Sequence, residues 1–341
     1  MTIRLSSIII VVLAFFMLAA TSSAGLNNGL VLYLPLYGNA NDWSTNNNDG
    51  TVYGAEPTTD RFGNKNGAYF FDGTDDYILV PSSNSLKFNN SISVCLWIKL
   101  NTLPSDSCCE YYLVSKMYNV YPNLDGFNLA VSTYNNHNIL FFRAAKSANW
   151  GDWHIGESIP FSAIPLNIYF QIVFTYDGTS NKAYLNGKLY HSQDNPGGNA
   201  GGNNEPLLIG FANWSSDSRH FKGIIDEVRI YNRALSELEI KKLYHVGSND
   251  DFGSLIDKLA QEPFLLSEKE PSFVQSLSSQ RLRILRNTVF ARHGYPFTNR
   301  QLKKFFDKRK WYNPESKKII LSETDKENID FIEAIEKRRR H

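Results

Sequence analysis

Short runs of alternating apolar and polar residues constrain this chain more than any other feature. Such runs recur between residues 28 and 246, and in one of them Ile92, Val94, Leu96 and Ile98 share a face. A period of two residues is typical of half-buried β-strands. Many short strands separated by polar turns predict a sandwich or jelly roll. No long helical pattern falls between the strands, which argues against a parallel α/β fold.

Turn and helix signals refine this prediction. Asn186-Gly187 separates the strand-like segments 183–185 and 188–190. Because this dipeptide tolerates positive φ at both positions, it predicts a type I′ hairpin turn. The last strong strand pattern spans residues 223–231. Ser236 and Glu239 then have the spacing of a capping box, so the first helix is expected to begin there.

Several segments of this region resemble a known family. They occur in the order LPLYGNAND (34–42), FDGTDDYILVP (71–81), YDG (176–178), the turn at 184–187, and GIIDEVRIYNRAL (223–235). Together they are similar to the laminin-G-like, concanavalin A-like lectin/glucanase superfamily. The resemblance implies a mainly β jelly-roll sandwich of two antiparallel sheets, a carbohydrate- or glycoprotein-binding role and a structural calcium ion. One departure is Tyr37, which stands where an acidic residue is common.

The residue pattern of the C-terminal region predicts helices. Leu282, Leu285 and Val289 form a stripe with helical spacing, and Gly294 is expected to end that helix. Thr298 with Gln301 predicts the start of a second helix, and Thr324 with Glu327 predicts the start of a last one.

A second resemblance lies within these helices. The segments LRNTVFARHGYPF (285–297) and WYNP (311–314) resemble the bacterial YARHG domain. That family is regarded as extracellular and its activity is undefined, so the resemblance implies a location more than a function. Phe290 stands at the position of the name-giving tyrosine, which argues against a catalytic role there.

Domain limits follow from these patterns and from charge. We expect a signal peptide at 1–24, a jelly-roll domain at 25–246, a linker at 247–264 with a short helical stretch, and a YARHG domain at 265–341. Residues 262–341 carry 18 basic and 11 acidic side chains, although the whole chain has a net charge of only +1. The opposite signs of the two parts support the split.

The N-terminal segment resembles a secretory signal. Arg4 precedes an apolar run from Ile8 to Ala20, and small residues follow at 22–24. We therefore expect cleavage and a secreted, extracellular or periplasmic location, with an uncleaved anchor as the alternative. No other stretch is long enough to span a membrane, so no transmembrane helix is expected after removal of the signal.

Three cysteines are present in a chain that is expected to be exported. Cys95 lies in a strand pattern and is expected to be a small buried side chain. Cys108 and Cys109 are adjacent and could pair with each other, or one of them could pair with Cys95.

A carboxylate in the last strand suggests a metal site. Alternation places Asp226 on the apolar face with Val228 and Ile230, and a buried charge needs a partner. That partner could be a cation, an arginine or backbone N–H groups. Calcium prefers oxygen ligands, so we expect a structural calcium ion with Asp226 and Asp42 as ligands. Asp72 is expected to be a turn residue, and Asp75-Asp76 either a metal ligand pair or a solvated loop.

Glycoside hydrolysis finds no support in the sequence. The glucanase branch of the superfamily uses paired carboxylates on one strand face, and no strong strand has acidic residues at i, i+2 or i, i+4. Asp226 and Glu227 are adjacent and are expected to point to opposite faces. We therefore predict a protein that is not an enzyme, with a glycoside hydrolase as the less favoured alternative.

Aromatic loops and basic residues suggest binding. Trp150, Trp153 and Trp214 lie in polar loops and could contact a glycan or glycoprotein, although they could also cap the sandwich core. Arg292 could bind an anionic cell-envelope polymer or simply complement a helix C-terminus. No acid, serine or cysteine is near His293 in the sequence, so it is not expected to be catalytic. Nucleic acid is not an expected partner, and a protein-binding adhesion or structural module remains the alternative.

Overall fold

The structure is a computed structural model that describes residues 25–88, 90–104, 110–120, 123–132, 139–147, 154–194, 202–213, 220–246, 249–269, 271–315 and 319–339. The strands of the N-terminal domain are Leu30–Leu34 (β1), Thr51–Tyr53 (β2), Glu56–Thr58 (β3), Ala68–Asp72 (β4), Tyr77–Val80 (β5), Ile92–Lys99 (β6), Glu110–Val120 (β7), Asn123–Ser132 (β8), Ile139–Ser147 (β9), His154–Pro160 (β10), Tyr169–Tyr176 (β11), Ser180–Leu185 (β12), Lys188–Asp194 (β13), Leu207–Ile209 (β14) and Lys222–Tyr231 (β15).

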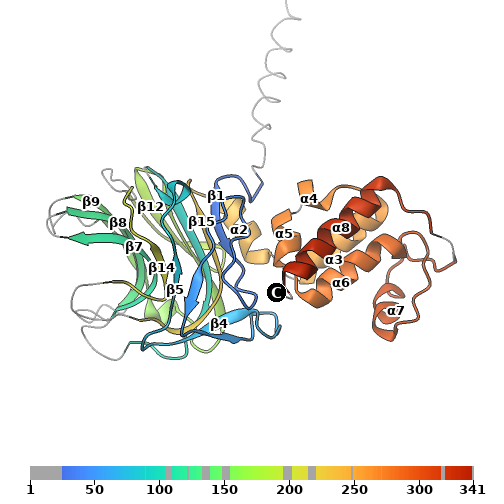
Figure 1. The fold of residues 1–341 in the computed structure, drawn as a ribbon, viewed down its shortest axis with the longest axis horizontal. Helices are drawn as coiled ribbons and strands as arrows, with labels where there is room; N and C mark the ends of the chain where they lie inside the picture. Colours follow the sequence, from blue (N-terminus) through green and yellow to red (C-terminus); the bar gives the residue numbers. More distant parts are fainter. Residues whose placement is uncertain are drawn as a thin grey trace, which may run out of the picture.

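These strands form two antiparallel sheets. Within the described residues, sheet A has eight strands in the order β13-β12-β11-β6-β15-β4-β3, with β1 also paired to β15. Sheet B has seven strands in the order β10-β9-β8-β7-β14-β5-β2. The sheets are stacked face to face (Figure 1). The predicted jelly-roll sandwich is therefore confirmed.

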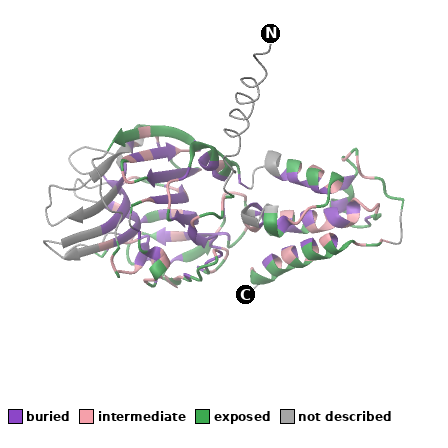
Figure 2. Ribbon diagram, turned by 90° about the horizontal axis from the view of Figure 1, so that it is seen from above, coloured by how far each residue is buried: buried purple, intermediate pink, exposed green. Residues whose placement is uncertain are grey.

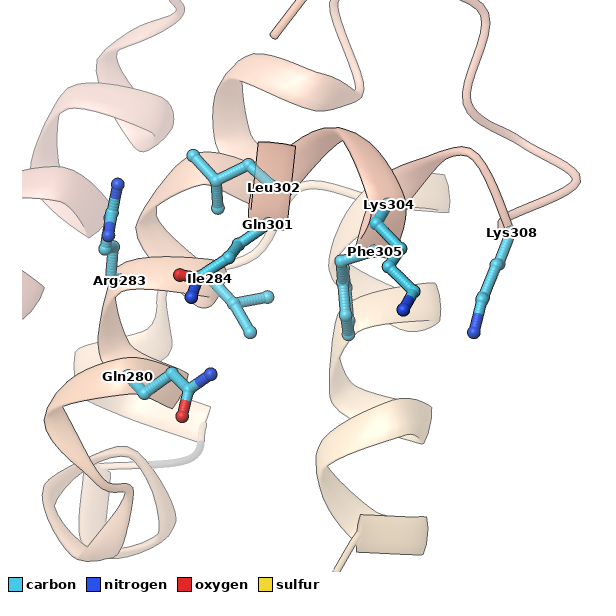
Figure 3. Close-up of a pocket in the computed structure, with 8 residues that line it drawn as sticks. All are labelled: Gln280, Arg283, Ile284, Gln301, Leu302, Lys304, Phe305 and Lys308. Carbon is cyan, nitrogen blue, oxygen red and sulfur yellow. The ribbon is translucent and has the colours of Figure 1, made fainter. Parts of the chain in front are cut away.

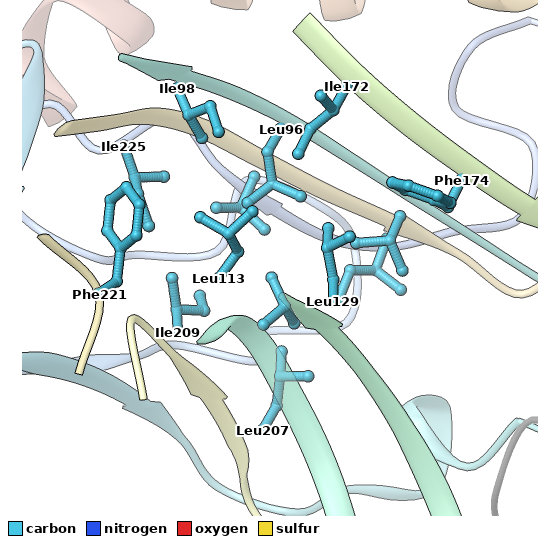
Figure 4. Close-up of a cluster of buried hydrophobic side chains, with 14 of the residues drawn as sticks. Leu96, Ile98, Leu113, Leu129, Ile172, Phe174, Leu207, Ile209, Phe221 and Ile225 are labelled. Atoms are coloured by element: carbon cyan, nitrogen blue, oxygen red, sulfur yellow. The ribbon is translucent and has the colours of Figure 1, made fainter. Parts of the chain in front are cut away.

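A hydrophobic core fills the space between the two sheets (Figure 4). Ile92, Val94, Leu96 and Ile98 all belong to this core, as their alternation in the sequence predicts. Side chains of sheet B meet them from the opposite side, among them Leu129 of β8. Burial of this apolar surface is the main force that holds the sandwich together.

The β12–β13 hairpin also matches its prediction. Asn186 has a φ of 51° and Gly187 a φ of 74°, and a type I′ turn needs positive φ at both positions. The paired strands continue from Leu185 and Lys188 on either side of the turn. β13 is the last strand at this edge of sheet A.

The outer face of sheet A is covered by helices. The helix α2, Glu237–His245, begins at the predicted capping box of Ser236 and Glu239. A second hydrophobic cluster extends from the outer face of sheet A through α2 into the C-terminal helices. Figure 1 places α2 and the start of the helical domain beside β1, and Figure 2 shows the helical part at one end of the sandwich. The cluster includes Tyr33, Cys95, Val173, Tyr231, Ile240, Leu243, Leu277, Leu282 and Ile335.

The remaining helices form the C-terminal domain. Their bounds are Asn249–Gln261 (α3), Leu266–Lys269 (α4), Pro271–Ser276 (α5), Ser279–Ala291 (α6), Arg300–Phe306 (α7) and Glu323–Arg338 (α8). α6 packs against both α3 and α8. Gly294 follows α6 with a φ of 76°, as expected of a residue that ends a helix.

Two helix starts differ from their predictions. α7 is capped by Asn299 instead of Thr298, and α8 begins at a capping box of Ser322 with Asp325 instead of Thr324 with Glu327. Both pairs in α8 have the same spacing, so the local sequence does not discriminate between them. Asp325 is buried and also binds the side chains of Arg292 and His293, which directly follow α6, and this explains why this pair is selected.

The segment expected to be a linker is mostly helix. α3 occupies residues 249–261, and its Leu255, Ile256 and Leu259 are buried in the second cluster. The short helical stretch in the sequence is therefore the buried face of a longer helix. Its helical structure depends on tertiary packing more than on its weak local signal.

Contacts between the two domains involve arginines of the helical domain. The guanidinium of Arg339 lies 3.9 Å from the ring centre of Tyr37 and donates a hydrogen bond to the carbonyl of Gln275. Arg281 lies 5.4 Å from the ring centre of Phe62. Tyr37, the departure from the family pattern, therefore contributes to the domain contact.

Two sequence expectations concern the cysteines and the membrane. Cys95 is a buried, free thiol, so the alternative that links it to Cys108 or Cys109 is wrong. Those two cysteines and the expected signal segment lie outside the described residues. Among the described helices, none has the length and apolarity required to cross a bilayer.

Candidate functional site

The jelly roll contains a cluster of buried charged side chains on β15 and beside it. The register of β15 against β6 shifts between Ile225 and Glu227, so Asp226 is an extra residue in a β-bulge. Asp226 and Glu227 therefore both reach Arg61, at 2.8 Å and 3.1 Å. Arg229 lies 2.7 Å from the other oxygen of Glu227.

This bulge overturns two predictions. Asp226 does not share the apolar face with Val228 and Ile230, and Asp226 and Glu227 do not point to opposite faces. The extra residue breaks the alternation of side chains, which a regular strand would have maintained. Of the partners considered for Asp226, the structure supplies an arginine, Arg61, together with the Arg61 backbone N–H at 3.1 Å.

Electrostatics in this cluster separate the two carboxyl groups. Burial raises the pKa of Asp226 to about 7, although the charge of Arg61 opposes the shift. Burial acts in the same sense on Glu227, but Arg229 and Arg61 outweigh it and lower its pKa. Both carboxyl groups are held by guanidinium groups and are almost fully buried, with 2% of Asp226 and 6% of Glu227 exposed. The cluster is therefore suited to stabilising the fold.

Asp42 is also provided with hydrogen-bond donors. Its carboxylate accepts bonds from the backbone N–H groups of Tyr33, Ser44 and Asn48, at 2.8 to 2.9 Å. The hydroxyl of Ser44 donates a further bond of 2.7 Å. These donors satisfy a buried carboxylate. The assignment of Asp42 and Asp226 as calcium ligands stays a prediction.

The turn between β4 and β5 brings three carboxylates together. Asp72, Asp75 and Asp76 each offer an oxygen, and these oxygens lie within 4.8 Å of one another. Asp72 accepts a hydrogen bond from the backbone of Thr74, which confirms its turn role. We call these three residues the acidic turn. Carboxylate oxygens are ligands that calcium prefers, so this is a candidate cation position among the described residues.

An aromatic ledge lies beside the acidic turn. We define it as Tyr53, Tyr77, Phe211 and His220. Tyr53 and Tyr77 are opposite each other on β2 and β5, and their rings stack at 4.6 Å with an angle of 13°. Phe211 lies 5.5 Å from Tyr77 and stacks on His220 at 4.4 Å. Ile78 and Val80 of β5 point into the core, so alternation places Tyr77 on the outer face of sheet B.

Asp76 links the ledge to the acidic turn. Its backbone carbonyl lies 3.2 Å from Nδ1 of His220, and it directly precedes Tyr77. A β-carbon at Gly54, the residue after Tyr53, would collide with the Asp76 carboxylate. The two features are therefore one continuous surface. The ledge is not apparent from the sequence because its rings come from segments far apart in the chain, although the outward position of Tyr77 in its strand is a signal for it.

A cleft of about 710 Å³ lies between the β12–β13 hairpin and α2. Tyr244 of α2 lines it and stacks on Trp97 at 5.5 Å. Leu189 and Tyr190 of the edge strand β13 also line it and are 45% and 46% exposed. This volume is in the range of small-molecule and peptide sites. The cleft is a second candidate for ligand contact.

The helical domain places Arg292 and His293 around one carboxylate. Arg292 lies 2.8 Å and His293 Nε2 lies 3.0 Å from Asp325, and the hydroxyl of Ser322 bonds the same oxygen as His293. An acid that is not near His293 in the sequence therefore lies beside it in the structure, because a residue 32 positions away folds against it. Since Ser322 and His293 contact the same oxygen, they form no Ser–His relay. The Arg292 side chain is only 9% exposed, and its anion-binding role stays a prediction.

An exposed basic pocket opens elsewhere in the helical domain. Its volume is about 310 Å³, and Figure 3 shows the side chains that surround it. Arg283 lies on one side of the pocket, and Lys304 and Lys308 lie on the other. We call this site the basic pocket. Its lining residues are Gln280, Arg283, Ile284, Gln301, Leu302, Lys304, Phe305 and Lys308.

The three tryptophans predicted to contact ligand lie outside the described residues. Trp150 and Trp153 belong to segment 148–153 and Trp214 to segment 214–219. Trp214 falls in the sequence between Phe211 and His220, which are members of the aromatic ledge. Their roles in ligand contact stay predictions.

Family comparisons agree with the two-part fold. Residues 72–241 match the concanavalin A-like lectin/glucanases superfamily, and residues 260–337 match the YARHG domain. No curated protein matches the chain significantly.

Several solved structures are similar to part of this chain. The binding domain of Paraclostridial Mosquitocidal Protein 1 has a TM-score of 0.52 and 23% identity, covering 67% of this chain and 53% of its own. Domain 4 of AbnA, a GH43 extracellular arabinanase from Geobacillus stearothermophilus in complex with arabinotriose, has a TM-score of 0.46 and 23% identity, with 63% and 98% covered. The receptor binding domain of botulinum neurotoxin D has a TM-score of 0.49 and 18% identity, with 68% and 54% covered. The chain thus spans about half of each toxin binding domain.

Proposed function

From a chain that contains a domain of the concanavalin A-like lectin/glucanases superfamily followed by a YARHG domain, we propose an exported, non-catalytic binding protein. Its jelly roll recognises a carbohydrate or the glycan of a glycoprotein. Its helical domain contacts an anionic polymer of the bacterial cell envelope. The proposed export rests on the signal-like segment at residues 1–24.

The observation that carries this proposal is the aromatic ledge beside the acidic turn. Tyr53 is 42% exposed and is held in place by stacking on Tyr77. A fixed aromatic ring offers a flat apolar surface at little cost in side-chain entropy, which suits the apolar face of a sugar ring. The exposed carboxylates of Asp72 and Asp75 are hydrogen-bond acceptors for sugar hydroxyls.

The absence of hydrolysis in the proposal rests on what the carboxylates do. A glycosidase needs one carboxylic acid and one carboxylate beside the scissile bond. Asp226 and Glu227 are adjacent in the fold, but each is paired with arginine and nearly inaccessible. They therefore have no free approach to a sugar. Because the same fold can host different functions, the absence of hydrolysis is inferred from these residues and not from the fold.

Charge supports the part assigned to the helical domain. Residues 262–341 carry 18 basic and 11 acidic side chains, which favours attraction to an acidic surface. Calcium, expected from the resemblance, enters the proposal as a stabiliser of the jelly roll. The binding test is therefore performed with and without it.

A protein-binding module is the second candidate function. It is favoured by the edge strand β13, which presents the exposed Leu189 and Tyr190 next to the cleft at α2. An unpaired strand edge with apolar side chains can accept a strand of a partner. In this case the cleft, and not the ledge, would determine affinity.

A glycan array with residues 25–341 tests the proposal, with and without calcium. Tyr53→Ala is expected to weaken glycan binding by about tenfold, because it removes one stacking platform. Tyr190→Ala is the matched control, since this tyrosine is 46% exposed but lines the cleft. Loss of binding in the control alone would assign recognition to the cleft. No glycan bound by the wild type, or turnover of a polysaccharide, would refute the proposal.

A further inference from the structure

We propose that the basic pocket binds a polyol-phosphate chain, in which phosphodiester groups alternate with short uncharged polyol units. This inference deepens the proposed function and rests on the part of it that assigns envelope contact to the helical domain. It identifies which residues make that contact and which anionic chemistry they recognise.

The cations of the basic pocket are uncompensated. Arg283, Lys304 and Lys308 line the basic pocket, and none of them is paired with an acidic side chain within the ranges that the structure describes. Other cations of the same domain are paired. Lys303 contacts Asp307 at 3.1 Å, Arg286 contacts Glu333 at 3.0 Å, and Arg309 contacts Asp257 at 3.1 Å. A pocket whose cations lack internal partners attracts an anionic ligand.

The cations lie on two sides of the basic pocket. Arg283 on α6 lies at one side of the pocket, while Lys304 on α7 and Lys308 after it lie at the other (Figure 3). A single carboxylate or phosphate offers one anionic group to cations that lie on two sides of the pocket. A chain with successive phosphates separated by a neutral unit can place one phosphate at each side. Arginine and lysine both bind phosphate, arginine as a planar fork and lysine as a point charge.

The rest of the pocket lining is apolar or carries amide groups. Ile284, Leu302 and Phe305 provide apolar surface, and Gln280 and Gln301 provide amide groups. This combination suits a polyol, whose carbon chain packs on apolar side chains and whose hydroxyls bond to amides. Phe305 is fixed by an edge contact with Phe306 at 5.1 Å, and Arg309 lies 4.9 Å from its ring centre. The Phe305 ring is therefore held in place before a ligand binds.

The surroundings of the basic pocket favour a soluble polymer over a bilayer surface. The large hydrophobic side chains that are exposed in the described chain include Leu166, Ile168, Tyr295 and Ile320, and none of the exposed group lines this pocket. A surface that inserts into a membrane would present such side chains at its rim. Here the apolar residues line the pocket and the charged residues surround them.

The test measures binding of poly(glycerol phosphate) to the full chain from residue 25, by titration calorimetry at low salt. The variant Lys304→Gln/Lys308→Gln is expected to weaken binding by about tenfold to hundredfold, because each charge-assisted contact contributes a substantial part of the affinity. Arg283→Gln is expected to weaken it similarly. The matched control is Lys303→Gln/Lys310→Gln, which removes the same charge from the same segment but leaves the pocket lining intact.

Each possible result leads to a different conclusion. Equal losses in the pocket and control variants would show that diffuse charge, not the pocket, determines binding, and would overturn the inference. Equal affinity for polyglutamate would overturn the assignment to phosphate. Pocket-dependent binding to phosphatidylglycerol vesicles, without binding to the soluble polymer, would assign the site to a bilayer. Circular dichroism and urea unfolding of each variant establish that it is folded.

A second measurement distinguishes this inference from the proposed function. The same variants are sedimented with isolated cell-envelope fragments. If the wild type and the pocket variants sediment equally, envelope contact stands and the basic pocket is not its site. If the polymer binds in the pocket but the wild type does not sediment, the pocket inference stands and the envelope role fails.

Discussion

The guanidinium of Arg61 lies 2.8 Å from the carboxylate of Asp226, although 165 residues separate them in the chain. Arg61 also reaches Glu227, and its guanidinium lies 4.7 Å from the ring centre of Trp97. One residue of the loop before β4 thus compensates two neighbouring acids on β15. The jelly roll relies on this contact at the point where a bulge breaks its regular strand pattern.

Removal of Arg61 is expected to destabilise the jelly roll strongly. Arg61→Gln leaves two buried carboxyl groups without their shared guanidinium, and such a loss costs about 3–5 kcal/mol in the free energy of unfolding. Urea unfolding measures this change. Lys303→Gln is the control, because Lys303 pairs with Asp307 at the surface and should cost about 0–1 kcal/mol. Equal effects of the two substitutions would contradict the structural role of Arg61.

The raised pKa of Asp226 predicts a pH dependence of stability. Because its pKa is about 7 in the folded protein and 3.8 without perturbation, the folded state binds the proton more tightly. This contribution is complete below about pH 4 and is lost as the pH rises through about 7. As the pH rises from about 4 to about 7, the wild type should therefore lose stability relative to Asp226→Asn, because the asparagine side chain does not titrate. The opposite contribution of Glu227 is present in both proteins and cancels. A wild type that gains stability over the same interval would show that attraction to Arg61 outweighs burial.

The hairpin glycine and a helical glycine should respond in opposite directions to alanine. Gly187 has a φ of 74°, and an added β-carbon would lie 3.0 Å from Cβ of Tyr244. Gly187→Ala should therefore cost about 1–2 kcal/mol in the free energy of unfolding. Gly253 lies within α3, with no atom closer than 4.0 Å to its added β-carbon. Gly253→Ala should stabilise by about 0.5–1 kcal/mol. Thermal unfolding of both variants checks the signs, and a stabilised Gly187→Ala would refute the turn assignment.

The C-terminal arginines allow a test of the domain contact. Arg339→Ala removes a guanidinium that lies 3.9 Å from the Tyr37 ring centre and bonds to Gln275, so it should cost about 1–2 kcal/mol in unfolding free energy. The neighbouring Arg338 lies 6.0 Å from the ring centre of Trp43 and is exposed, so Arg338→Ala should have little effect. Urea unfolding compares the two. If both variants match the wild type, the contact of Arg339 with Tyr37 contributes nothing measurable to stability.

The sequence by itself determined the fold class and the domain order, because both depend on repeated local patterns. Alternation in Ile92 to Ile98 predicted a strand and its buried face, and Asn186-Gly187 predicted a turn that its backbone angles confirm. Family motifs predicted a concanavalin A-like domain followed by a YARHG domain, as the comparisons found. These signals lie within short segments of the sequence, so they can be interpreted without knowledge of contacts between distant residues.

Only the tertiary structure decided which side chains meet. The bulge at Asp226, its pairing with Arg61, the carboxylate of Asp325 beside His293 and the stacking of Tyr53 on Tyr77 all join distant segments or break a local period. The choice between Ser322 and Thr324 as a helix cap likewise depends on the buried partners of Asp325. Local spacing carries no information on such pairings, because their free energy comes from burial and charge compensation between parts of the chain that only folding brings together.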